Sequence, residues 1–131
     1  MLRVARLLKP GGVVGILTPN LDGLFARSSY RVARRIDYWP AVSPPTHLFQ
    51  FSTRSLTALL DRADLGILEV EHAALPLAYV FGRARQLNPK RLAYAAVFVP
   101  IMPAGPHVRA GDEILVVAAR PAAGATHTPQ P

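Results

Sequence analysis

The sequence predicts an α/β fold, in which helices flank a mostly parallel sheet. The stretch Val13–Leu17 is apolar without polar alternation, which is typical of a strand covered on both faces inside such a sheet. Ser52 is a favourable N-cap, and leucine and alanine recur at helical spacing behind it, so we expect a helix over Thr53–Arg62. A buried strand together with an amphipathic helix indicates a layered α/β domain.

Two further strands follow the predicted helix. Ile67, Leu68 and Val70 form an apolar strand in which glutamates alternate, so one of its faces meets solvent or an edge. Glu113–Arg120 is apolar almost throughout, and we expect it to pair with the Ile67 strand in a hairpin-like arrangement.

The first residues predict a short amphipathic helix over Met1–Leu8, with apolar and basic side chains on different faces. Pro10 ends this helix, and Gly11 and Gly12 permit a tight reversal into the Val13 strand. A helix followed by a buried parallel strand is the second half of a βαβ unit. We therefore expect the first strand of that unit to precede residue 1.

Asn20 is a candidate substrate-binding residue because it follows the Val13 strand directly. In open α/β sheets, ligands bind beyond the carboxyl ends of the strands. The amide of asparagine can both donate and accept hydrogen bonds there.

The stretch Leu21–Ile36 predicts a second helix, which carries a stripe of arginines. These are Arg27, Arg31, Arg34 and Arg35. One interpretation is a clamp for a phosphate or carboxylate on a substrate, with Arg31 as a binding residue, because guanidinium offers bidentate hydrogen bonds. The other is a solvated face above a ligand cleft, which we favour because charged stripes on helices usually face water.

The next segment is too rich in proline for regular structure, so we expect a loop from Asp37 to Pro45. Tyr38 and Trp39 lie in it, and aromatic side chains above the carboxyl edge of a sheet are suited to lining a substrate pocket. A plain packing role for the two rings is an equal alternative.

We expect residues 1–120 to form one domain. Leu75–Met102 is apolar with interspersed basic residues, and Pro89 divides it into two helical pieces. No run reaches the ~18 uninterrupted apolar residues that a membrane span requires. Pro121–Pro131 is predicted to be a disordered tail.

Composition excludes several kinds of site. The chain of 131 residues contains no cysteine, which removes disulfides, thiolate metal ligands and thiol nucleophiles, and its four histidines lack metal-ligand spacing. The net charge of +7 suits an anionic partner such as nucleic acid, but an arginine bias in the coding sequence explains it as well and is the interpretation we favour. No signal-peptide pattern follows Met1, so we expect a cytoplasmic protein.

Four features together resemble the carboxyl-terminal half of a class I methyltransferase dependent on S-adenosylmethionine. They are Leu7–Gly12 before a buried strand, Pro19-Asn20 after it, the Pro45–Ser52 run before a leucine-rich helix, and a final apolar strand. In that family the sheet is Rossmann-like, with seven strands, and the last strand is antiparallel and lies between the fifth and the sixth.

The resemblance implies a three-stranded remnant of this sheet. Val13–Thr18 would be the fifth strand, Ile67–His72 the sixth and Glu113–Arg120 the seventh. The neighbouring fourth strand is missing from the sequence, so Val13–Leu17 should present an exposed apolar edge unless a partner covers it. Relatives often have Ala-Gly-Phe after the leucine-rich helix, whereas Ala63-Asp64-Leu65 stands here, so we expect a differently built turn.

The same resemblance assigns the cofactor to the other half of the domain. Relatives bind S-adenosylmethionine at a glycine-rich turn after their first strand, and no such turn follows a strand in this sequence. We therefore expect no cofactor-binding residues and no S-adenosylmethionine binding by this chain alone.

His47 is the candidate catalytic residue, by resemblance to a histidine that faces the cleft in relatives. A near-neutral imidazole there can take the acceptor's proton during methyl transfer. The equal alternative is a loop histidine that holds the backbone of the Pro44-Pro45 turn.

The leading hypothesis is therefore a truncated methyltransferase-family chain, inactive alone, whose methyl acceptor is unidentified. The alternative is a non-catalytic interaction module, which pairs through the residue 13–17 edge with a complementary chain or a second copy. Nucleic-acid binding through Arg27–Arg35 is the third and least favoured hypothesis.

Overall fold

The computed structural model describes residues 1–36, 49–74, 89–122 and 124. Three strands form one sheet: β1 (Val13–Pro19), β2 (Gly66–Ala73) and β3 (Glu113–Ala119). The helices are α1 (Leu2–Leu7), α2 (Leu24–Ile36), α3 (Thr53–Asp61), α5 (Pro89–Phe98) and α6 (Ala104–His107), with a 3-10 turn, η2 (Val99–Ile101).

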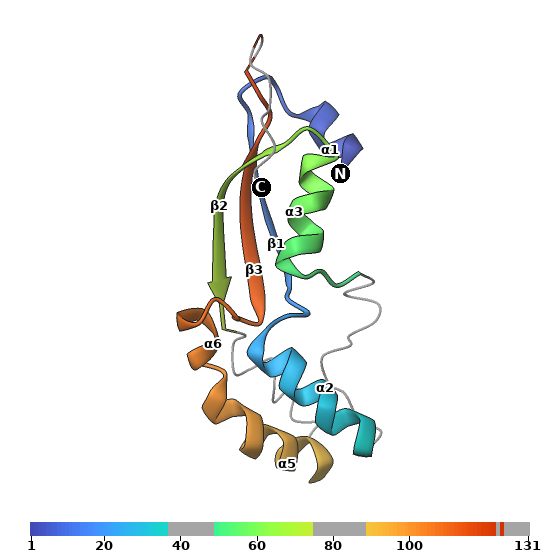
Figure 1. Cartoon of the computed structure of the whole chain (residues 1–131), viewed down its shortest axis with the longest axis vertical. Helices are drawn as coiled ribbons and strands as arrows, with labels where there is room; N and C mark the ends of the chain where they lie inside the picture. Colours follow the sequence, from blue (N-terminus) through green and yellow to red (C-terminus); the bar gives the residue numbers. More distant parts are fainter. Residues whose placement is uncertain (37–48, 75–88, 123, 125–131) are drawn as a thin grey trace.

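The strand order is β1-β3-β2, and β3 runs antiparallel to both neighbours. The expected position of the last strand, in the middle and antiparallel, is confirmed, as is its pairing with β2. The expectation of a mostly parallel sheet is wrong for the described strands, because both ladders are antiparallel. β1 and β2 nevertheless run in the same direction, so their carboxyl ends meet at one end of the sheet (Figure 1).

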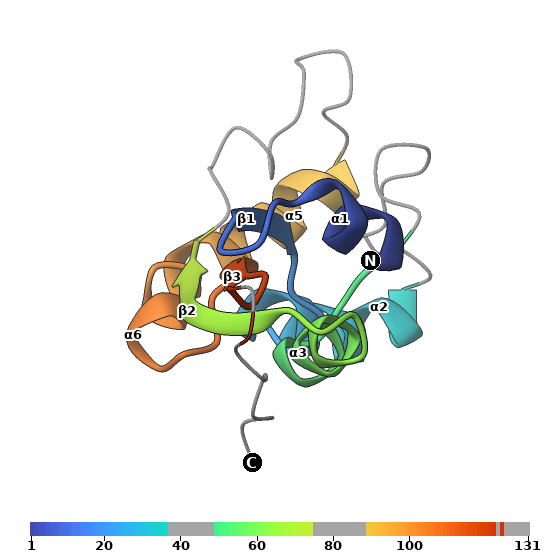
Figure 2. The same ribbon diagram turned by 90° about the horizontal axis from the view of Figure 1, so that it is seen from above.

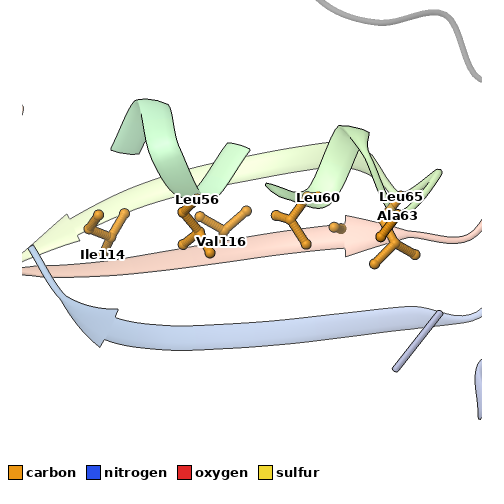
Figure 3. Packing of buried hydrophobic residues seen from close by; sticks show 7 residues of the cluster. Leu56, Leu60, Ala63, Leu65, Ile114 and Val116 are labelled. Carbon is orange, nitrogen blue, oxygen red and sulfur yellow. The ribbon is translucent and has the colours of Figure 1, made fainter. Parts of the chain in front are cut away.

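The main core lies between α3 and one face of the sheet. Leu56 and Leu60 of α3 pack against Ile114 and Val116 of β3, and all four side chains are fully buried (Figure 3). Residues of α1 pack against the same cluster, and α1 and α3 lie on the same side of the sheet (Figure 2). Burial on β3 alternates strictly, so only one face of this strand is fully covered.

The α3 helix confirms the most specific local prediction. The Ser52 hydroxyl accepts a hydrogen bond from the Ser55 amide (3.1 Å), and the Ser55 hydroxyl accepts one from the Ser52 amide (2.9 Å). This capping box satisfies amides that the first helical turn leaves without partners.

The end of α3 differs from the expectation. Asp64 adopts the left-handed backbone conformation (φ 56°), and the Leu65 amide donates to the Leu60 carbonyl (3.1 Å). This is the hydrogen bond of a Schellman motif, which glycine usually supports. The turn is therefore the ordinary one, with aspartate in the place of glycine, because Asp and Asn tolerate this conformation better than most residues.

The Lys9–Gly12 turn is fixed by the far end of the chain. Gly11 takes a positive φ of 77°, and its amide donates to the carbonyl of Arg120 (3.0 Å). The Arg120 guanidinium in turn donates to the Leu8 carbonyl at the end of α1 (2.6 Å). A cation at a helix carboxyl end is favourable, so Arg120, directly after β3, holds both the helix and the turn.

β1 is not covered on both faces, contrary to the pattern of its sequence. Val13 and Leu17 are 55% and 61% exposed, and no strand among the described residues pairs with the outer edge of β1. The apolar edge expected when a neighbouring strand is missing is thus present in the described part of the chain.

A second, smaller core forms where β1 and β2 end. Phe25 of α2 contacts Phe98 of α5 edge to face, with ring centroids 5.7 Å apart, and Ala95 and Met102 complete the cluster. α2, α5 and α6 therefore gather below the sheet in Figure 1. The first of the two helical pieces predicted around Pro89 lies outside the described residues, whereas the second is α5. None of the described helices has the length and hydropathy to cross a bilayer.

Candidate functional site

The candidate site lies at the end of the sheet where β1 and β2 stop and β3 begins. The turn after β1, the residues before β3 and the first turn of α2 meet there, as the lower part of Figure 1 shows. The backbone amide of Asn20 donates to the Asp112 carbonyl (2.8 Å), and the backbone amide of Leu24 donates to the Ala110 carbonyl (2.7 Å). These bonds join segments that are far apart in the sequence.

Asn20, predicted to bind substrate, lies in the middle of this junction and is only 2% exposed. Its side-chain Nδ2 donates to the Gly111 carbonyl (2.7 Å), and its Oδ1 accepts from the Asp22 amide (3.0 Å). Both ends of the amide are therefore used to hold the turn after β1 against the start of β3. Its role towards a substrate stays a prediction.

Asp112 is the residue of this site that the sequence analysis missed. It is 2% exposed, and its Oδ1 accepts a hydrogen bond from the Phe25 amide (2.9 Å). The Ala26 amide also stabilises the carboxylate. The carboxylate thus caps the first turn of α2, where the helix dipole favours a negative charge. Its Oδ2 is buried and has no hydrogen-bond partner in the part of the chain that the structure describes.

The environment of Asp112 raises the pKa of its carboxyl group from 3.8 to about 6. Burial is the largest cause, because it disfavours the charged form, and the nearby charge of Glu113 adds to it. The amides of Phe25 and Ala26 act in the opposite direction by stabilising the carboxylate. The effect of desolvation on the pKa of Asp112 is therefore larger than the opposite effect of the amides at the start of α2.

Glycines make this close approach possible. A Cβ on Gly23 would lie 2.6 Å from Asp112 Oδ1, and one on Gly111 would lie 2.6 Å from the carbonyl oxygen of Ala73 in β2. Both distances are shorter than any ordinary contact, so these positions admit no side chain without movement of the backbone.

His72, a half-buried residue, carries a second buried polar atom without a described partner near this end of the sheet. It lies opposite Ile114 of β3, and Thr18 of β1 lies opposite the same residue on the other side. His72 Nδ1 is buried without a hydrogen-bond partner among the described residues, and Thr18 is buried. No group of His, Cys, Asp and Glu in the described ranges is arranged to hold a metal ion.

Arg31, the other predicted substrate residue that the structure describes, lies on the outer surface of α2. All four arginines of the predicted stripe are exposed, and two open hollows lie along them. The first, of about 300 Å³, is lined by Leu21, Ala26, Arg27, Tyr30 and Arg31. The second, of about 540 Å³, is lined by Tyr30, Arg31, Arg34 and Arg35.

The remaining predicted residues fall outside the described ranges. These are His47, the candidate catalytic residue, and the aromatic pair Tyr38 and Trp39. The structure therefore brings together Asn20 and Asp112 in a buried junction and places Arg31 on an accessible basic surface. The junction can position α2, and the basic surface can bind an anion.

The signal that could have identified Asp112 is its place in the chain. It stands directly before an apolar strand that runs antiparallel to β1, so its position is at the carboxyl edge where Asn20 also lies. Comparisons with known proteins do not assign a family: the chain matches no protein-family model, and no curated protein matches its sequence.

Proposed function

We propose that residues 1–120 are the acceptor-side part of a class I methyltransferase domain, and that other residues supply the S-adenosylmethionine site. The observation that carries this proposal is the strand order β1-β3-β2, with the last strand antiparallel between two strands that share a direction. In the methyltransferase sheet the last three strands have this arrangement.

Two local features support the same assignment. The Lys-Pro-Gly-Gly turn before β1 is built with a positive φ at Gly11, as a tight entry into the strand requires. The outer edge of β1, where the family sheet continues with its fourth strand, has no described neighbour. In this proposal, the described residues supply the half of the domain that begins near β1.

In this proposal the chain positions the methyl acceptor and does not bind the cofactor. Methyl transfer depends mainly on aligning the acceptor with the methyl group, so no acid or base is strictly required. Asn20 and Asp112 fix the start of α2 at the carboxyl end of β1. The proposed acceptor contacts are Asn20, Tyr38, Trp39 and Arg31, and His47 is the proposed proton acceptor.

Isothermal titration calorimetry tests the division between the two halves. We expect no heat of binding when S-adenosylmethionine is titrated into the 131-residue chain, because the glycine-rich turn that holds the cofactor is not in this sequence. An intact methyltransferase in the same buffer is the positive control. Micromolar affinity of the 131 residues would contradict the proposal.

The coding sequence upstream of Met1 provides the complementary arm. An in-frame segment that encodes a strand and a glycine-rich turn, joined to this chain, is expected to bind S-adenosylmethionine. If such an extended chain folds and does not bind the cofactor, the methyltransferase assignment fails.

The contrast between the two sheet edges supports a second candidate, a non-catalytic interaction module. β2, at one edge, carries Glu69 and Glu71 and has a register irregularity between Ile67 and Glu69. Charges and bulges of this kind protect an edge from pairing with another chain. β1, at the other edge, carries no charge and has a regular ladder with β3. Only the β1 edge is suited to pairing.

Size-exclusion chromatography with light scattering tests this candidate. We expect the chain to form a dimer, and Leu17→Lys on β1 to dissociate it, because a charged side chain on the pairing strand opposes association. Leu68→Lys on β2 is the matched control, since Leu68 is 62% exposed and Leu17 61%. A well-folded monomer of the unaltered chain at every concentration would exclude self-pairing.

A further inference from the structure

The arginine stripe of α2 has a feature that a simple solvated face does not require. The helix carries four arginines and no aspartate or glutamate over its thirteen residues. Helices that are merely solvated usually mix the two signs of charge, because pairs at i, i+4 are favourable and like charges at this spacing repel. Arg27 and Arg31, and Arg31 and Arg35, are like-charge pairs at this spacing.

The four guanidinium groups extend along one side of the helix. They span nine residues from Arg27 to Arg35, and the eight steps between these two correspond to about 12 Å along the helix axis. The described residues that line the hollow of Arg31, Arg34 and Arg35 include no carboxylate. An anion in this hollow would meet three guanidinium groups together, and guanidinium binds carboxylate and phosphate with paired hydrogen bonds.

The adjoining hollow has a different character. It shares Tyr30 and Arg31 with the hollow of Arg34 and Arg35 and is otherwise lined by Leu21, Ala26 and Arg27. Leu21 is an exposed apolar side chain beside the Asn20 turn, and the Tyr30 ring is half exposed between the two hollows. An apolar wall therefore continues directly from the arginine-lined surface.

We propose that the outer face of α2 binds an amphiphilic anion, a small molecule with a phosphate or carboxylate head and an apolar body. The head lies between Arg31, Arg34 and Arg35, and the apolar body extends past Tyr30 towards Leu21 and Ala26. Two hollows of about 300 and 540 Å³ fall in the volume range of small-molecule sites. The proposal requires only the described surface of α2 and does not depend on methyl transfer.

Both parts of such a ligand contribute. Exposed ion pairs alone stabilise a complex by about 1 kcal/mol or less, so the charged head by itself binds weakly. Apolar contact along Leu21 and Tyr30 adds affinity in proportion to the surface removed from water. A ligand that has only one of the two parts is therefore expected to bind more weakly than one that has both.

Calorimetric titration at about 0.15 M ionic strength tests the proposal, with decyl phosphate below its micelle-forming concentration as the probe. Inorganic phosphate and decanol are the two partial ligands, and each is expected to bind roughly tenfold or more weakly, a difference of about 1.4 kcal/mol. Equal affinity for decyl phosphate and either partial ligand would overturn the proposal.

Paired substitutions locate the site. Arg31→Gln with Arg34→Gln is expected to weaken decyl phosphate binding about tenfold or more, because two of the three guanidinium groups around the head are removed. The control is Arg6→Gln with Arg54→Gln, which removes the same amount of charge. Arg6 lies on α1 and Arg54 in the first turn of α3, both are exposed, and neither lines a hollow. This control is expected to change the affinity less than about twofold.

Three outcomes count against the proposal. Equal loss in the two double variants would mean a general effect of net charge, and no loss in the α2 variant would place the ligand elsewhere. Tighter binding of a single-stranded oligonucleotide than of decyl phosphate, with steep salt dependence, would identify a nucleic-acid surface instead.

A further variant, Leu21→Gln, keeps every charge and tests the apolar part of the site. It is expected to weaken the binding of decyl phosphate but not that of inorganic phosphate. Circular dichroism of each variant checks that α2 remains folded.

Discussion

Replacing Gly111 by alanine is expected to lower the free energy of unfolding by about 3 kcal/mol or more, because the added methyl group cannot be accommodated. The new Cβ would lie 2.6 Å from the carbonyl oxygen of Ala73, 2.8 Å from its amide nitrogen and 2.9 Å from the carbonyl carbon of His72. All three atoms belong to the backbone of β2, so no side-chain rotation relieves the contact.

The consequence extends beyond the contact itself. The Gly111 carbonyl accepts the hydrogen bond from Asn20, and the next residue, Asp112, caps α2. Backbone movement at Gly111 therefore disturbs the junction that positions α2 relative to the sheet. Urea unfolding followed by circular dichroism measures the change in stability.

Gly15→Ala is the matched control. A Cβ on Gly15 would meet only the Leu115 Cδ1 atom, at 4.0 Å, which is an ordinary contact. We expect this variant to match the unaltered chain or to exceed its stability slightly, since alanine restricts the unfolded chain more than glycine does. Equal stability of the Gly111 and Gly15 variants would show that the junction is not closely packed.

The second large effect concerns the pH dependence of stability. The pKa of Asp112 is about 6 in the folded chain and 3.8 in the reference state, so the folded chain binds this proton more tightly. The contribution of Asp112 to the free energy of unfolding then rises as the pH falls through about 6, and this gain is complete below about 3.8. The shift of about two pKa units corresponds to about 3 kcal/mol at most.

Asp112→Asn isolates this contribution. The amide oxygen of asparagine can still accept the hydrogen bond from Phe25, but asparagine does not titrate. Between about pH 7 and pH 4, the stability of the unaltered chain relative to this variant is expected to rise by about 2 to 3 kcal/mol. Denaturant unfolding at a series of pH values measures the difference.

Asp22→Asn controls for the loss of a carboxylate near the same turn, because Asp22 is exposed. The pH-dependent change is expected to be larger for Asp112→Asn than for Asp22→Asn, because only Asp112 is buried. If the Asp112→Asn curve runs parallel to that of the unaltered chain, the pKa of Asp112 is not raised by folding. Asp112→Ala, which also removes the cap of α2, is expected to be less stable than Asp112→Asn.

Both predictions concern the same junction, in which Gly111 and Asp112 join the sheet to α2. The Arg31 surface lies on the outer face of the same helix. A change at the junction is therefore expected to alter ligand binding on α2 indirectly, whereas the arginine substitutions act on binding without altering the fold. The two classes of variant distinguish a positioning effect from a direct contact.

Local patterns in the sequence predict those parts of the fold that local forces determine. The α3 helix begins at Thr53 after a Ser52 cap, as the pattern indicates, because the capping box spans only the four residues from Ser52 to Ser55. The Lys9–Gly12 turn follows from a proline that ends the helix and a glycine with positive φ. The arginine stripe of α2 is likewise a matter of spacing along one helix.

The α2 helix shows where such reasoning stops. Its pattern predicts a start at Leu21, whereas the helix begins at Leu24. The turn from Asn20 to Gly23 precedes it because Asn20 is held by Gly111 and the helix terminus by Asp112, residues about ninety positions away. No local pattern contains these partners.

What the sequence by itself determined is the approximate place of the three strands and of α1, α2, α3 and α5 along the chain, since helical and strand periodicities are local properties. The tertiary structure alone decided that β1 is exposed on one face, that Asn20 holds a buried turn, and that Asp112 caps α2 with a raised pKa. Burial and pairing depend on which distant segments meet, and the free energy of a charge or an amide depends on what surrounds it.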